Sequence, residues 1–108
     1  MLYDVPKEDI AKAIGKELGV SHELMYSLTR DHQGALGRSL AAYLGRKLSG
    51  YSIVDMARHF ERDPSVISQQ VVKAERLLLE DGKLAKRIDR VEKELILGRK
   101  KKYLVTNA

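Results

Sequence analysis

Short polar side chains gather near the expected start of one helix, where they could bind anions or the hydrogen-bonding edges of nucleobases. Ser65, Ser68 and Gln69 closely follow an Asp63-Pro64 pair. No histidine or lysine is spaced to activate either serine as a nucleophile. Hydroxyl and amide groups at such a position suit phosphate oxygens or base edges instead.

Other kinds of chemistry are not expected from this chain. The three histidines, His22, His32 and His59, are far apart and form no HExxH or other ligand spacing, and cysteine is absent. Gly34 and Gly37 lie between expected helices and do not form a GxxxxGK phosphate loop. We therefore expect no metal site, no cofactor, no catalytic residue and no enzymatic activity by the chain itself.

The polar cluster belongs to a stretch, Tyr51–Glu75, that predicts two helices joined by a tight corner. Ser52 can cap the first helix with Asp55 reaching back, and Asp63 before Pro64 is a start signal for the second. Each helix has one apolar face, formed by Ile53, Met56, Ala57 and Phe60 and by Ile67, Val71, Ala74 and Leu78.

This pattern predicts a helix-turn-helix with a polar outward face. The outward residues are Ser65, Val66, Gln69, Lys73 and Arg76. The corner falls at Glu61-Arg62 and contains no glycine, so we expect strain or an unusual geometry there.

Further helices must support this unit. Pro6 and Gly19 bound a helix over about 6–18, and Ser21 starts a short helix with Leu24, Met25 and Leu28 facing inward. The two glycines in 30–38 indicate a basic connecting loop. A third helix is expected to run from there to about residue 48, packing behind the two-helix unit.

The end of the chain is highly charged. Glu80-Asp81-Gly82 predicts a break, and Lys83–Leu97 carries a narrow apolar seam formed by Leu84, Ile88, Val91 and Leu95. We favour a helix that folds back on its own domain, and a homodimer contact through the seam stays as the alternative. The expected division is a DNA-binding helix-turn-helix domain over 1–82, and a charged helix with a basic tail over 83–108.

Composition and charge limit the partners. The 108 residues suffice for one modest core, and no apolar run approaches the roughly 20 residues that span a bilayer. The acidic N-terminal stretch does not resemble a signal peptide, so we expect a soluble, cytoplasmic protein without a membrane partner.

The net charge of +5 is unevenly placed. Arg30–Lys47 holds four bases and one acid, and Lys83–Lys102 holds nine bases and three acids. This favours a polyanion such as nucleic acid over a merely solvated basic surface. Residues 64–81 hold two bases and three acids, so attraction must come from the other two segments.

Three blocks, Arg38–Leu44, Arg46–Ser52 and Met56–Asp63, occur in one order after a helix ending in Leu18-Gly19. Over roughly residues 8–78 they resemble the C-terminal DNA-binding domain of the bacterial replication initiator family DnaA. The resemblance implies an all-α helix-turn-helix domain of about five to six helices, of the type also seen in the Trp repressor, with a basic C-terminal helix and tail. It implies double-stranded DNA as the partner.

Carried over by position, the resemblance places Arg38 near the minor groove or its phosphates and Ser52 at the DNA backbone. At the major groove it places Arg62, Asp63, Ser65, Val66 and Gln69. Ser68 and Lys73 are expected at phosphates, Arg30 is a weaker candidate, and Asp63 could instead serve only as a helix cap.

The second helix departs from the family pattern. The run Arg62-Asp63-Pro64-Ser65-Val66-Ile67 replaces Arg-Asp-His-Thr-Thr-Val, so the usual initiator target is not expected. This helix looks closer to the C-terminal domain of REP-associated tyrosine transposases. The chain is thus interpreted as the DNA-binding part of a replication-related or transposase-related protein, with a catalytic domain in the same or another chain. A protein-interaction module that dimerises through the C-terminal helix is the alternative.

Overall fold

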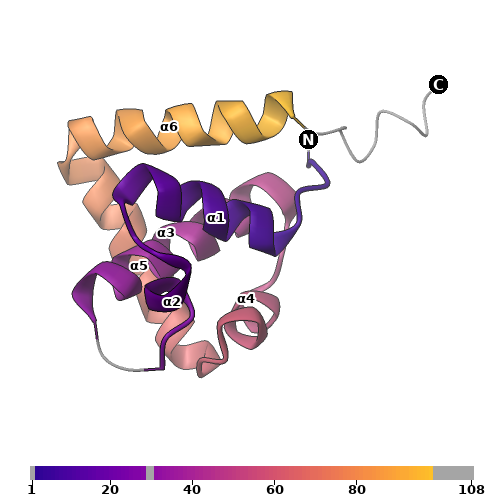
Figure 1. The fold of residues 1–108 in the computed structure, drawn as a ribbon, viewed down its shortest axis with the longest axis vertical. Coiled ribbons are helices and arrows are strands. Elements are labelled where there is room, and N and C mark those ends of the chain that lie inside the picture. Colours follow the sequence, from indigo (N-terminus) through magenta and orange to yellow (C-terminus); the bar gives the residue numbers. More distant parts are fainter. Residues whose placement is uncertain (1, 29–30, 99–108) are drawn as a thin grey trace.

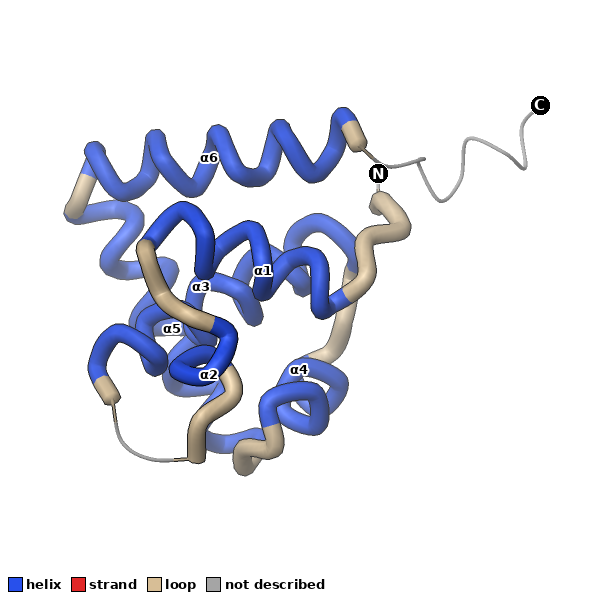
Figure 2. Tube along the Cα trace, viewed as in Figure 1, coloured by secondary structure: helices blue, strands red, loops and turns tan. Residues whose placement is uncertain are grey.

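The computed structural model describes residues 2–28 and 31–98, which form six helices and no strand (Figures 1 and 2). The helices are α1 (Lys7–Leu18), α2 (His22–Met25), α3 (His32–Ser49), α4 (Ile53–Phe60), α5 (Pro64–Glu80) and α6 (Gly82–Leu97). The prediction of an all-α fold of five to six helices is confirmed. Within the described ranges, no helix combines the length and apolarity needed to cross a membrane.

Helix α3 is the centre of the fold. It packs against α1, α2, α4 and α5. Its successive residues Leu40, Ala41 and Ala42 are all 0% exposed, because neighbouring helices cover it on several sides. The small alanine side chains let those helices approach closely, so α3 is the support against which α4 and α5 are held.

The chain before α1 is tied to the end of α3. The Tyr3 amide donates to the Leu48 carbonyl at 2.8 Å, and the Tyr51 hydroxyl donates to the Val5 carbonyl at 2.7 Å. Gly19 ends α1 in the left-handed conformation at φ 70°, which confirms the predicted stop.

The predicted basic loop over 30–38 is wrong for its described part, because α3 already begins at His32. Asp31 is the N-cap, and its carboxylate accepts a hydrogen bond from the Gly34 amide at 2.9 Å. We took the two glycines as breakers, but both are buried within α3. A Cβ on Gly34 would meet the Leu24 carbonyl oxygen at 2.6 Å, and one on Gly37 would clash with the Met25 sulfur. The glycines thus permit α2 to lie directly on α3.

The short helix after Gly19 is shorter than its apolar residues suggested. Helix α2 ends at Met25, which is buried under α1, whereas Leu28 is 64% exposed. The expectation that Leu28 faces inward is wrong, since the chain has already left the helix there.

Helix α6 folds back on its own domain, as favoured from the sequence. Leu84, Ile88 and Val91 are 7%, 2% and 3% exposed, and α6 packs against α1 and α5. Asp81 separates α5 from α6 and accepts a hydrogen bond from the Leu84 amide at 3.0 Å. Because the seam is covered within the chain, it does not offer the exposed apolar stripe that the dimer alternative requires.

Candidate nucleic-acid interface

The start of α4 is fixed by the predicted capping box. The Ser52 hydroxyl accepts from the Asp55 amide at 3.0 Å, and the Ser52 amide donates to the Asp55 carboxylate at 3.1 Å. These bonds to Ser52 lower the pKa of Asp55. Ser52 is exposed, but its amide already has a partner, so the free amides for an anion here are those of the next residues.

The corner between α4 and α5 lies at Glu61, which is the only non-glycine residue with positive φ in the described chain, at φ 53° and ψ 48°. An L-residue in this left-handed conformation is strained by about 1–2 kcal/mol because its Cβ approaches the backbone. The strain expected from the glycine-free corner is therefore confirmed.

Replacing Glu61 with glycine is expected to stabilise the fold by about 0.5–1 kcal/mol, because relief of strain exceeds the added freedom of the unfolded chain. Urea denaturation would measure the change. Glu61→Ala is the matched control, since it removes the charge and keeps the Cβ. Equal stability of the two variants would contradict the strain at this corner.

The start of α5 is organised by Asp63. Its carboxylate accepts from the Ser65 amide at 2.8 Å and from the Ser65 hydroxyl at 2.7 Å. The hydrogen bond from the Ser65 hydroxyl is the main reason that the pKa of Asp63 is lowered. Asp63 is thus a helix cap, and the Ser65 hydroxyl is held by it while both residues remain exposed.

The outward face of α5 is exposed as the spacing predicted. Ser68, Gln69 and Lys73 are exposed, and Val66 is 41% exposed. The sequence analysis did not single out Val72, which is 52% exposed and lies seven positions after Ser65 on the same face. A period-3.6 count from Ser65 would have found it.

Arg62 and Arg38 point into the protein and hold the chain after α2. Arg38 is 3% exposed, and its Nη1 donates to the carbonyls of Leu24 at 3.0 Å and Met25 at 3.2 Å. Arg62 donates to the Ser27 carbonyl through Nη2 and to the Leu28 carbonyl at 3.3 Å. Arg38 is therefore not the exposed loop residue we expected, because α3 begins before it and directs it inward. Arg30 lies outside the described residues.

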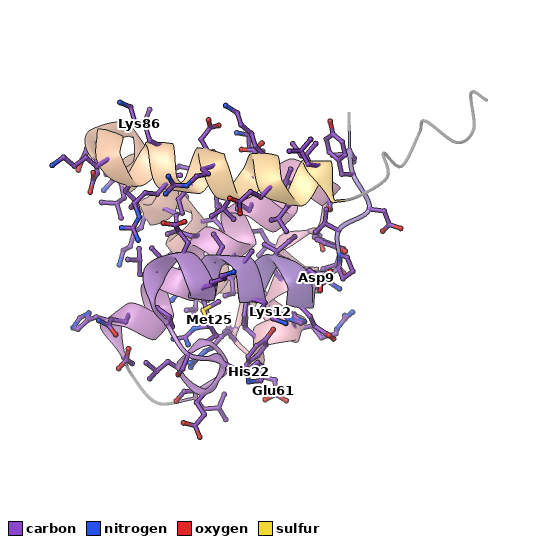
Figure 3. All side chains as sticks on the ribbon, turned by 45° about the horizontal axis from the view of Figure 1, so that its top comes forward. Asp9, Lys12, His22, Met25, Glu61 and Lys86 are labelled. Atoms are coloured by element: carbon purple, nitrogen blue, oxygen red, sulfur yellow. The ribbon has the colours of Figure 1, made fainter. Side chains whose placement is uncertain are left out.

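A hydrogen bond ties α2 to α4 beside the corner. The Tyr26 hydroxyl and His59 Nε2 are 2.6 Å apart, and both rings contact Phe60, with centroids 5.4 Å and 5.0 Å away. Burial, with the nearby charge of Lys7, lowers the pKa of His59. In Figure 3, His22 and Glu61 lie near each other at this end of the molecule.

This depressed pKa predicts a stability loss in mild acid. Below about pH 6.5 the unfolded chain binds a proton at His59 that the folded chain resists, so stability falls as the pH drops through this window and is constant above it. Thermal denaturation between pH 7.5 and 5.5 would show the decrease. His59→Gln keeps a polar partner for Tyr26 and should flatten the profile; an unchanged slope in that variant would assign the effect elsewhere.

The basic segments do not converge on α5. Lys86 on α6 lies at the opposite end of the molecule from Glu61 (Figure 3). Arg87 pairs with Glu17 at 2.8 Å. The 17-residue α5 separates the two ends by about 25 Å, well beyond the screening length of about 8 Å in physiological salt. The expectation that this segment attracts DNA toward α5 is thus wrong for α6, and residues 99–102 lie outside the described chain.

Of the bases in 30–47, one lies beside α4 and is exposed. Arg46 Nη1 donates to the Tyr51 carbonyl at 3.3 Å, next to the Ser52 cap, whereas Lys47 pairs with Glu92 on α6 at 3.0 Å. The position of Arg46 was not expected from the sequence, which gave only a summed charge. It places a guanidinium beside the amides that begin α4.

In the described part of the chain, no group of three or more histidine or acidic side chains is placed to hold a metal ion. The interface is instead the exposed face of α5, the capped start of α4 with Arg46, and the inward-turned arginines behind them.

Comparison with known proteins agrees with this geometry. Residues 7–73 match the family model described as the bacterial dnaA protein helix-turn-helix. The chromosomal replication initiator protein DnaA of Pseudothermotoga lettingae is 32% identical over 73 residues, covering 68% of this chain and 16% of that protein. The protein of the same name from Streptococcus mutans is 27% identical over 92 residues, covering 84% of this chain and 20% of that protein.

The chain therefore spans a fifth or less of the length of these curated relatives. No solved structure matches it. The matched region contains α1 to α4 and the first part of α5, with the corner at Glu61 and the polar start of α5.

Proposed function

The chain belongs to the bacterial DnaA helix-turn-helix family, and from this membership we propose that it binds double-stranded DNA with sequence preference. The observation that supports the proposal is the exposed polar face at the start of α5, directly after the strained corner. A helix presented in this way fits the major groove, where amide and hydroxyl groups can pair with base edges.

We assign roles to the exposed residues by their chemistry. Gln69 can pair with adenine, Val66 can meet a thymine methyl group, and Ser65 can bond to either a base or a phosphate. Ser68 and Lys73 are proposed phosphate contacts. At the start of α4, the free amides after Ser52 and the Arg46 guanidinium would hold a backbone phosphate.

Arg62, Asp63 and Arg38 are proposed to act indirectly. Asp63 caps α5 and orients Ser65, and the two arginines hold the chain after α2 against the corner. Their contribution to DNA binding is then the rigidity of the unit that carries the reading face.

Replacing Gln69 with alanine should cost about 1–3 kcal/mol on the best duplex and relax the preference at one base position. Lys73→Ala should weaken binding to all duplexes alike and reduce the salt slope by about one. Selection from random duplexes, followed by titration of the selected and a scrambled duplex, would measure both effects. An unaltered preference after Gln69→Ala would remove this residue from the reading face.

We further propose that residues 1–82 carry the DNA contacts and that 83–108 supports them. The chain would serve as the DNA-binding part of a replication-related or transposase-related cytoplasmic protein whose catalytic domain lies in the same or another chain. An ATPase sequence in the native reading frame would favour the first, and a nuclease sequence the second. A self-associated form in sedimentation would revive the homodimer, with a surface other than the covered seam of α6.

A further inference from the structure

A cavity of about 560 Å³ lies between the start of α3 and the start of α5. Asp31, His32 and Arg38 line it from the α3 side. Arg62, Val66 and Gln70 line it from the corner and from α5. Since Val66 belongs to the exposed face of α5, the cavity borders the surface proposed to meet DNA.

The cavity walls contain an unusual set of polar atoms. In residues 2–28 and 31–98, the buried side-chain nitrogens and oxygens without a hydrogen-bond partner are Arg38 Nε, Arg62 Nε and Gln70 Oε1. All three residues line this one cavity. Folded proteins pair nearly all buried polar atoms, so three together point to a missing partner. A half-turn of the Gln70 amide would place its NH₂ group here, which gives three donors.

The charges around the cavity favour an anion as that partner. Neither Arg38 nor Arg62 forms an ion pair with a described residue, since their Nη atoms donate to backbone carbonyls. Burial lowers the pKa of Arg38, and the charge of Arg62 lowers it further, which shows that the two cations repel each other. Asp31 is the acidic neighbour, and its carboxylate also accepts from the Gly34 amide. One carboxylate beside two guanidinium groups leaves a positive balance.

We infer that this cavity is an oxyanion site formed by Arg38, Arg62 and Gln70, and that a phosphate of bound duplex DNA occupies it. Guanidinium Nε–H groups and an amide NH₂ match the acceptor oxygens of a phosphodiester. The occupant rests on the proposed function, whereas the oxyanion chemistry rests on the cavity alone. Binding there would hold the backbone next to the reading face of α5, and would couple it to the chain after α2.

Inorganic phosphate is the probe for the site itself. In thermal denaturation at fixed ionic strength, phosphate should raise the melting temperature above that in chloride, by about 6–10 °C at ten times its dissociation constant. Gln70→Glu places a carboxylate between the two guanidinium groups. This variant should melt higher than the parent in chloride, lose the phosphate-dependent rise and bind the duplex about tenfold more weakly or worse.

Gln69→Glu is the matched control for the phosphate measurement, because its side chain is exposed and does not line the cavity. It should keep the phosphate-dependent rise. Gln70→Met gives a neutral variant in case the buried carboxylate impairs folding, and it should reduce the rise without the gain in chloride.

Four outcomes separate the claims. Loss of both the phosphate effect and duplex affinity in Gln70→Glu supports the inference. Loss of the phosphate effect with unchanged duplex affinity would assign the site to a free oxyanion and overturn the DNA phosphate. A parent chain without any phosphate-dependent rise would overturn the site. A phosphate-dependent rise in a parent chain that binds no duplex would support the site and refute the proposed function.

Discussion

Replacement of Phe60 with alanine is expected to lower the free energy of unfolding by about 3–5 kcal/mol. Phe60 is 1% exposed and is the last residue of α4, directly before the corner. Its ring contacts those of Tyr26 and His59, so its loss would open a cavity where α2 and α4 meet. A loss of this size is a large part of the roughly 5–15 kcal/mol that stabilises a typical domain.

Urea denaturation followed by circular dichroism would measure the effect. Val54→Ala is the matched control, because Val54 lies on the same helix and is 50% exposed. It should change stability by less than about 0.5 kcal/mol beyond its small loss in helix propensity. Similar losses in the two variants would mean that Phe60 does not anchor the corner.

Replacement of Arg38 with alanine is expected to destabilise the fold by about 2–4 kcal/mol. Its Nη1 donates to carbonyls at the end of α2, and those acceptors would be left buried without a donor. The apolar part of the side chain would also lose its packing. The prediction distinguishes a structural role for Arg38 from the direct groove contact implied by the family resemblance.

Arg46→Ala provides the comparison on the same helix, since Arg46 is exposed and lies beside the start of α4. That variant should remain within about 0.5 kcal/mol of the parent in stability and lose duplex affinity. If Arg38→Ala instead unfolded at the parent's urea concentration but bound duplex weakly, Arg38 would contact DNA directly.

Local signals in the sequence were enough to predict the helix-turn-helix. The capping residues Ser52 and Asp63 and the apolar spacing of α4 and α5 act within one or two turns, so they can be recognised without knowing the rest of the fold. The lack of glycine at the corner correctly indicated strain at Glu61.

The start of α3 could not be predicted in the same way. Gly34 and Gly37 commonly mark a turn, and only the position of α2 shows that they are small to let it pack on α3. The direction of Arg38 follows from this: one turn of helix in place of a loop moves its side chain from the surface into the interior. Charge counting failed for a related reason, because Lys47 and Arg87 find acidic partners on distant helices.

The candidate site shows the same division. The outward residues of α5 follow from its period, including Val72, which a complete count would have found. The cavity by Gln70 could not be predicted, since it is formed by residues from α3, the corner and α5 that meet only in the folded chain.

The central claim is that the exposed face of α5 reads duplex DNA. Its most direct test is a fluorescence anisotropy titration of a selected and a scrambled duplex between about 50 and 200 mM salt. We predict that affinity for both falls linearly on a log–log plot, while the selected duplex binds at least about 10³-fold more tightly than the scrambled one. Equal affinity for the two duplexes, or binding that does not change with salt, would contradict the account.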